Sequence, residues 1–396
     1  MTPIGMKIAA KISGKTLVRV LLPGILLLAS CAPQHPKDMA AVEGIRAALD
    51  SLLQVGARQP DGDPAPFTLE NLRIVRRAEE NEPDSVQRLR LTILRRHLAS
   101  EMLARSTHPA ADAPALARET GFSSAREMIE EVYGFSFAAT RALAESLLSR
   151  TDSLALALGE ERFLPSPPEV ERSFESPALL PAARSTFRLM GGDSAAVMEK
   201  LRAKGGLDGY TESFDEMGSA LYDANVTERA LEFRSLADRT IDSTFRSLAE
   251  GILSNPAWMR QNLGMPVPVL KTYARLIVDR RLFVARLRAG MIISNLTLRP
   301  DGEPGLLHAE GGVPLLARLP AWFRAAMLSA QLDAWLRSRY GVNWYENPEA
   351  AETLRGICSQ RGRLNAEGLL RKIGASEIRT DEWLRSVNEL LLLSSR

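Results

Sequence analysis

The chain has 396 residues, and its 50 Lys and Arg are nearly balanced by 48 Asp and Glu. This balance leaves no basic excess to attract a nucleic acid or an anionic membrane surface. With only two cysteines, the fold must rest on its hydrophobic core, and the length suffices either for one large helical domain or for two fused lobes.

A cleaved signal sequence is indicated over residues 1–30. An apolar stretch of ten residues, Val20 to Ala29, follows four basic residues, Lys7, Lys11, Lys15 and Arg19. A membrane-spanning helix would need about 20 apolar residues, so the stretch predicts a leader. Leu-Ala-Ser directly before Cys31 resembles the lipobox of bacterial lipoproteins, which implies that the Cys31 thiol is lipidated and begins the mature chain. The alternative is an ordinary secretory signal with a chance cysteine.

Removal of the leader changes the charge of the mature chain. Residues 1–30 carry four basic and no acidic residues, so 46 Lys and Arg then face 48 Asp and Glu. Membrane contact would come from the acyl chains on Cys31, and Cys358 would have no intrachain partner. We therefore expect a lipid-anchored protein of the bacterial cell envelope with no nucleic-acid partner. Ala32 after the cysteine favours, by analogy with other lipoproteins, the periplasmic face of the outer membrane in a two-membrane host.

The rest of the chain is typical of an all-α protein. Apolar residues recur at helical spacing, whereas alternating strand-type runs are almost absent. A short tether over 31–37 leads to an N-terminal helical part over 38–164. Prolines between 165 and 168 separate it from a larger C-terminal part over 169–396.

Several helices are predicted with their ends. Long stretches without Gly or Pro predict helices over 135–158 and 269–298. Asn347 followed by Pro348 is an N-terminal cap with proline at the first helical position. Another helix is expected to begin near Asn365 and to stop at Gly374.

One interior segment, 209–225, carries the most specific pattern. It predicts a glycine turn followed by a helix with Asp215 and Ser219 four residues apart on one face and Glu216 beside them. It resembles the zinc helix of the thimet-oligopeptidase and peptidyl-dipeptidase-like metallopeptidases, a group of gluzincins, whose pattern is Asp-Tyr, a spacer, His-Glu-x-Gly-His-Ala-Leu-His and Ala-Asn. The chain keeps the tyrosine, Glu-x-Gly, Ala-Leu and Ala-Asn, but Asp215 and Ser219 replace the two zinc-binding histidines.

The third zinc ligand of that family is a glutamate on a following helix. Asp238 to Phe245 resembles the segment that carries it, and the ligand position falls on Ser243. The neighbouring Asp242 is expected to point about 100° away around the helix. The whole resemblance covers roughly residues 115–390, including Trp322 to Arg355 as closing helices.

These substitutions imply that the zinc chemistry is lost. Ser219 is a weak neutral ligand and Asp215 alone cannot hold the ion, so Glu216 would be a general base without a metal-activated water. We expect no metal and no cofactor. Active relatives also carry strands before the zinc helix, but only about 20 residues separate Gly192 from Phe214 here. The resemblance therefore implies a peptidyl-dipeptidase-like helical fold with these strands reduced or absent.

Other polar and aromatic residues have structural interpretations. Asp215, Glu216 and Ser219 are equally consistent with polar residues on an exposed helix face. Cys358 is interpreted as a buried apolar residue. Packing is expected for Trp322, Trp335, Trp344 and Tyr345, and a solvated helix face for the charged run Arg275, Asp279, Arg280, Arg281, Arg286 and Arg288.

The resulting hypothesis is a lipid-anchored, catalytically inactive metallopeptidase-like protein. It would act in the cell envelope as a peptide-binding, protein-binding or scaffold module. The alternative is an active peptidase or hydrolase with an altered site around Glu216. A purely structural lipoprotein with a closed cleft is a third possibility.

Overall fold

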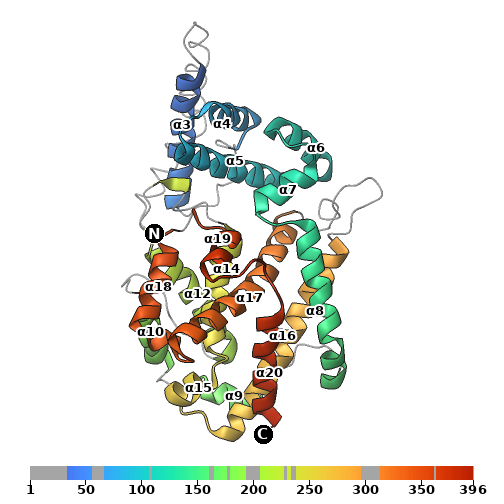
Figure 1. Cartoon of the computed structure of the whole chain (residues 1–396), viewed down its shortest axis with the longest axis vertical. Helices are drawn as coiled ribbons and strands as arrows, with labels where there is room; N and C mark the ends of the chain where they lie inside the picture. The colour runs from blue at the N-terminus through green and yellow to red at the C-terminus, as the bar shows by residue number, and fades with distance from the viewer. Residues whose placement is uncertain are drawn as a thin grey trace. The chain divides into compact units, whose positions relative to one another are not determined.

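The computed structural model describes residues 34–55, 67–106, 109–159, 165–175, 179–192, 206–226, 230–232, 238–295, 313–360 and 363–395. Within these ranges all regular structure is helical, with sixteen α-helices and one short 3-10 turn. The prediction of an all-α protein is thereby confirmed (Figure 1). Among the described residues, no helix combines the length and the apolar character needed to cross a membrane.

The expected leader, 1–30, and the lipidation residue Cys31 lie outside the described residues. The expected tether over 31–37 is corrected in part, because the first described helix, α3 (Gln34–Val55), already includes its second half. Pro36 falls in the first turn of α3, where a proline removes no intrahelical hydrogen bond. The stretch 193–205, in which the missing strands were sought, also lies outside the described residues.

The helices form two compact units. The first unit contains α3, α4 (Leu69–Asn81), α5 (Ser85–Arg105), α6 (Pro109–Thr120) and α7 (Ala125–Tyr133). Side-chain caps begin two of these helices: the Thr68 hydroxyl accepts from the Asn71 amide at 3.2 Å, and the Asp84 carboxylate accepts from the Gln87 amide at 2.7 Å. The buried apolar side chains include Ile45, Leu72, Val75, Leu91, Leu94 and Ile129.

A distant segment completes the first unit. Residues 230–232 follow α12 in sequence but pack among the N-terminal helices. Glu232 has no exposed surface, and its carboxylate accepts from Arg46 Nε and, at 3.0 Å, from Arg90 Nε. A buried carboxylate is stable only when it is paired, so these two arginines fix the segment in place.

The second unit holds the remaining helices. They are α8 (Phe137–Leu158), α9 (Pro168–Ser173), α10 (Leu179–Leu189), α12 (Gly206–Ala224), α14 (Arg239–Ile252), α15 (Pro256–Leu263), α16 (Val267–Asn295), α17 (Val313–Tyr340), α18 (Pro348–Cys358), α19 (Ala366–Lys372) and α20 (Asp381–Ser395), with a 3-10 turn η2 (Trp344–Glu346) before α18. The helices expected over 135–158 and 269–298 correspond to α8 and α16. The predicted cap at Asn347 and the predicted stop at Gly374, whose φ is 74°, are also present.

The boundary between the units differs from the predicted one. Sequence punctuation placed it at 165–168, which put α8 in the N-terminal part. In the structure the second unit begins at Gly134, because α8 packs along α16. Figure 1 shows α16 lying between α8 and α20, and the contacts agree. The long central helix, not the proline cluster, therefore determines where α8 belongs.

The core of the second unit surrounds α12 and α14. Phe214 of α12 meets the Trp258 ring edge-on at 5.4 Å, and Tyr222 stacks on Phe245 of α14 at 5.2 Å. The Trp258 indole nitrogen donates to the Thr186 hydroxyl at 2.9 Å, so a fully buried tryptophan has a partner for its polar atom. This aromatic packing holds α12 against α14, and the polar residues of interest lie at the same contact between the two helices.

Candidate functional site

Helix α12 contains the segment predicted as a degenerate zinc helix. It begins at Gly206, three residues before the predicted Gly209, and Gly206 has a φ of 81°, a conformation that favours glycine. The Glu171 carboxylate of α9 accepts from the Leu207 amide at 3.0 Å. An acidic group at a helix N-terminus accepts hydrogen bonds from unpaired amides and interacts favourably with the helix dipole. The predicted helix is thus present, with an earlier start.

Gly218 allows α12 to approach α14 closely. A Cβ atom at this position would lie 2.2 Å from the Phe245 carbonyl oxygen and 2.6 Å from Cα of Arg246. Any larger residue would push the helices apart. The glycine that ends the Glu-x-Gly pattern therefore has a packing role that requires no metal.

Arg246 of α14 occupies the centre of the polar face. Its Nη1 donates to Asp215 Oδ2 at 2.6 Å, its Nη2 to Ser219 Oγ at 2.7 Å, and its Nε to Asp242 Oδ2 at 2.9 Å. The Ser219 hydroxyl also donates to Asp242 Oδ1 at 3.2 Å. We call these four residues the Arg246 network. Asp215 and Ser219, which the resemblance assigns to zinc-ligand positions, are thus brought together, with a guanidinium between them.

Asp242 contacts Ser219, whereas the third ligand position was predicted at its neighbour Ser243. Ser243 is buried, with 7% of its surface exposed, and makes no bond to the Arg246 network. The difference arises because α14 meets α12 through the face that bears Asp242 and Arg246, one helical turn apart.

Glu216, which the resemblance assigns to a general-base position, is exposed on α12. It has no bond to the Arg246 network among the described residues. Asp215 and Ser219 are half-buried. The interpretation as an exposed polar residue therefore fits Glu216, whereas its two neighbours face α14.

The donor set of the network does not fit a zinc ion. It offers two carboxylates and a neutral hydroxyl, and all three side chains are already bonded to one permanent cation. Burial acts to lower the Arg246 pKa, but Asp242 and Asp215 raise it above its ordinary value, so the guanidinium stays charged. In the described part of the chain, no three His, Cys, Asp or Glu side chains gather in a way that could hold a metal ion.

A cavity of about 550 Å³ opens beside the network, and we call it the arginine cavity. It is bordered by α12, α14, α16 and α17, all of the second unit. Its lining consists of Asp215, Arg239, Asp242, Ser243, Arg246, Ser247, Glu250, Arg288, Arg318, Ala321 and Trp322. Four arginines from three helices therefore face a single cavity.

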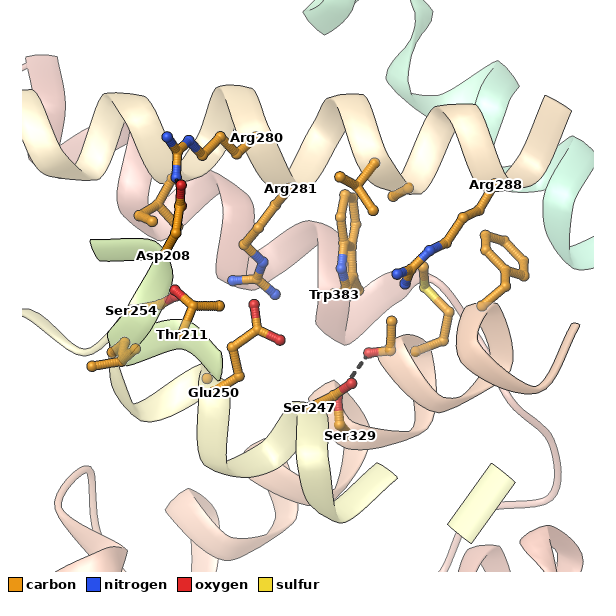
Figure 2. Close-up of a pocket in the computed structure, with 18 of the residues that line it drawn as sticks. Asp208, Thr211, Ser247, Glu250, Ser254, Arg280, Arg281, Arg288, Ser329 and Trp383 are labelled. Atoms are coloured by element: carbon orange, nitrogen blue, oxygen red, sulfur yellow. Dashed lines mark hydrogen bonds and ion pairs between the residues drawn. The ribbon is translucent and has the colours of Figure 1, made fainter. Parts of the chain in front are cut away.

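A second cavity of about 320 Å³, the inner cavity, adjoins the first. Ser247, Glu250 and Arg288 line both. Figure 2 shows Arg280, Arg281 and Arg288 descending from α16, with Glu250 of α14 pointing toward Arg281. Arg280 pairs with Asp208 at 2.7 Å, and Arg281 donates to the Ser386 hydroxyl at 3.2 Å.

Glu250 is the one carboxylate common to the two cavities. Its side chain is exposed, because both cavities open onto it, yet many protein atoms surround its carboxyl group and penalise the charge. This burial raises the pKa of Glu250, against the attraction of Arg281 and Arg288 and with help from Asp215. No ion pair joins Glu250 to either arginine within the described residues. Burial likewise lowers the pKa of Arg281 and of Arg288.

The sequence did not indicate that arginines would line the arginine cavity and the inner cavity. The run from Arg275 to Arg288 was interpreted as a solvated face, but Arg281 and Arg288 turn into the inner cavity. Trp322 was assigned to packing, yet it lines the arginine cavity with the Arg288 guanidinium 5.7 Å from its ring centre. One local signal was available, since Asp242 and Arg246 stand four residues apart and predict a helix ion pair.

No protein-family model, no curated protein and no solved structure matches this chain. The family resemblance therefore rests on the residues quoted in the sequence analysis. What the site can do must be argued from its own chemistry.

Proposed function

We propose that the chain is a catalytically inactive, metallopeptidase-like binding module, lipid-anchored in the bacterial cell envelope, whose ligand is a peptide or a segment of an envelope protein. The observation that carries the proposal is the Arg246 network. A guanidinium bonded to Asp215, Ser219 and Asp242 holds the positions that the resemblance assigns to zinc ligands. A fixed positive charge there opposes binding of a second cation.

Loss of catalysis follows from the same arrangement. In the resembled family the metal supplies the activated water, and the glutamate removes its proton. Here Glu216 is exposed and apart from the Arg246 network. The fold does not depend on these groups, because aromatic packing and the close contact at Gly218 hold α12 and α14 together.

The two cavities support the proposal that the protein binds a ligand. Volumes of about 550 and 320 Å³ lie within the range of ligand pockets in proteins. Aromatic walls, Trp322 in one cavity and Trp383 in the other, offer apolar area beside charged groups. Such a combination suits a short peptide stretch with both apolar and polar side chains.

The experiment tests whether the protein retains peptides without cleaving them. The purified protein is incubated with a mixed peptide library, retained peptides are identified by mass spectrometry, and zinc is measured on the same sample. We expect a retained subset, intact peptide termini and substoichiometric zinc. Ser247→Trp should fill both cavities and abolish retention, whereas Leu156→Trp, at an exposed position on α8, should leave it unchanged. Stoichiometric zinc with peptide hydrolysis would refute the proposal, as would equal retention by the Ser247→Trp variant.

A further inference from the structure

Three arginines of the arginine cavity have no acidic partner within the described part of the chain. Arg239 of α14, Arg288 of α16 and Arg318 of α17 all line it. None of the three forms an ion pair with an acidic residue of the described chain, whereas Arg246, Arg280 and Arg286 of the same unit do. Arg239 and Arg318 are exposed, and Arg288 contacts the Trp322 ring. Three unpaired guanidinium groups thus border one concave surface.

The acidic residues of the cavity do not neutralise them. Asp215 and Asp242 are bonded to Arg246, so among the described lining residues Glu250 is the carboxylate left to balance the three. These described residues comprise four arginines and three carboxylates. A concave wall with excess positive charge concentrates anions.

The guanidinium groups of the three arginines are suited to binding an anion. A guanidinium presents several N–H groups in a plane and binds carboxylate or phosphate oxygens in pairs. Arg288 lies over the Trp322 ring, with Cζ 5.7 Å from its centre, and this contact limits the orientations of its side chain. The three residues come from different helices and so surround a ligand instead of flanking it in one row.

We propose that the arginine cavity binds an anionic group, a carboxylate or a phosphate, through Arg239, Arg288 and Arg318. This inference rests on the proposed function, because the anionic group would be the part of the peptide or protein ligand that the cavity recognises. It goes beyond that function because it assigns the binding of this group to three named arginines. Glu250, facing the same space, opposes the anion when it is charged.

The experiment uses calorimetric titration of the full chain at constant ionic strength. Three probes are compared: inorganic phosphate, tricarballylate and the uncharged triamide of tricarballylic acid. We expect binding of at least one anion and none of the triamide. Comparison of the affinities for phosphate and tricarballylate shows which of the two anions the cavity prefers.

Variants assign the site. Arg318→Gln and Arg288→Gln should each weaken anion binding about tenfold or more, since a charge-assisted hydrogen bond is lost. Glu250→Gln should strengthen binding, an outcome that a misfolded variant cannot give. The control is Arg141→Gln, an exposed arginine on α8 that pairs with Glu145, and it should bind as the parent does.

Failure of this inference is distinguishable from failure of the proposed function. Acidic peptides are compared with their amidated neutral counterparts in the retention assay. If neutral peptides are retained equally well, the anion site is wrong and the binding module stands. If phosphate or tricarballylate binds but no peptide is retained, the anion site stands and the peptide-binding function fails. Equal affinities of the parent, Arg288→Gln and Glu250→Gln would overturn the anion site.

Discussion

Nη1 of Arg246 lies 2.6 Å from Oδ2 of Asp215, and this ion pair joins α14 to α12. Asp215 is the residue that stands at the position of the first zinc ligand in the resembled family. The guanidinium is therefore an obstacle to a metal in addition to the missing histidines. Ligand replacement alone should not recreate the metal site.

The double change Asp215→His and Ser219→His should leave the protein without stoichiometric zinc as long as Arg246 is present. Addition of Arg246→Ala should permit zinc binding, because two imidazoles and the Asp242 carboxylate form a three-ligand set. Ser219 and Asp242 already lie 3.2 Å apart. Zinc content after dialysis, measured by elemental analysis, distinguishes the variants.

Two further changes test which residue supplies the carboxylate. Asp242→Asn in the zinc-binding variant should abolish binding, and Ser243→Ala should not. If Ser243→Glu were required for binding instead, the original assignment of the third ligand to Ser243 would be right. We expect little peptidase activity even in the zinc-binding variant, because positioning of the substrate contributes about 7–11 kcal/mol to catalysis and no substrate-aligning strand is present in the described residues.

Local sequence signals predicted the helices well. Asn347 with Pro348, and Asn365 with Gly374, act within one or two turns of the chain, so their effects can be deduced from neighbours alone. The direction of a side chain toward another helix is different, because it depends on how two helices pack. The contact of Asp242, and not of Ser243, with Ser219 depends on this packing.

The cavities could not be predicted for the same reason. Arg281 and Arg288 are seven residues apart and thus share a face of α16, but their sequence does not say whether that face meets solvent or protein. In the structure α8, α9 and α20 all pack against α16. Only the assembled unit makes the charged face of α16 the wall of a cavity.

Gly218→Ala tests the close contact of α12 and α14. The added Cβ would lie 2.2 Å from the Phe245 carbonyl oxygen. The atoms on both sides of the contact belong to helix backbones, which cannot move without disturbing the packing of α12 and α14. We expect a loss of about 1–3 kcal/mol or more in the free energy of unfolding, measured by urea denaturation. The control is Gly290→Ala on α16, which has open space around the added atom and should gain up to about 1 kcal/mol. Equal effects of the two changes would show that the helices are not in close contact.

Glu232→Ala tests the segment that completes the first unit. Glu232 is fully buried between Arg46 and Arg90, and its removal leaves the buried Arg46 with only the exposed Glu43 as an acidic partner among the described residues. We expect a loss of about 3–5 kcal/mol in denaturant unfolding. Glu43→Ala removes an exposed partner of the same Arg46 and should cost about 1 kcal/mol or less. Similar losses would mean that Glu232 does not anchor the segment.

The proposed lipid anchor is tested at Cys31. Cys31→Ser should abolish labelling by radioactive palmitate and leave the protein uncleaved or released into the soluble envelope fraction, because the cysteine thiol is the group that receives the diacylglyceryl unit. The buried Cys358 provides a matched control, and Cys358→Ser should remain labelled. Persistent labelling of Cys31→Ser would refute the anchor.

Glu250→Gln gives a prediction about pH. Burial raises the pKa of Glu250, with Arg281 and Arg288 opposing this rise and Asp215 adding to it. A carboxyl group with a raised pKa binds more protons in the folded state than in the unfolded state. Its contribution to stability is therefore complete below the ordinary carboxyl pKa of about 4.3. It is lost progressively as the pH rises from there to the raised value.

The neutral amide removes this dependence. Glu250→Gln should therefore have a higher melting temperature than the parent at pH 7, and the difference should shrink toward zero as the pH falls to about 4. Thermal unfolding followed by circular dichroism over this range measures it. Glu145→Gln, which removes an exposed ion pair with Arg141, should change the melting temperature by only about a degree at pH 7. A melting temperature of Glu250→Gln below that of the parent at pH 7 would show that Arg281 and Arg288 stabilise the charged carboxylate. The cavity would then hold an ion-pair cluster, and Glu250 would not oppose an incoming anion.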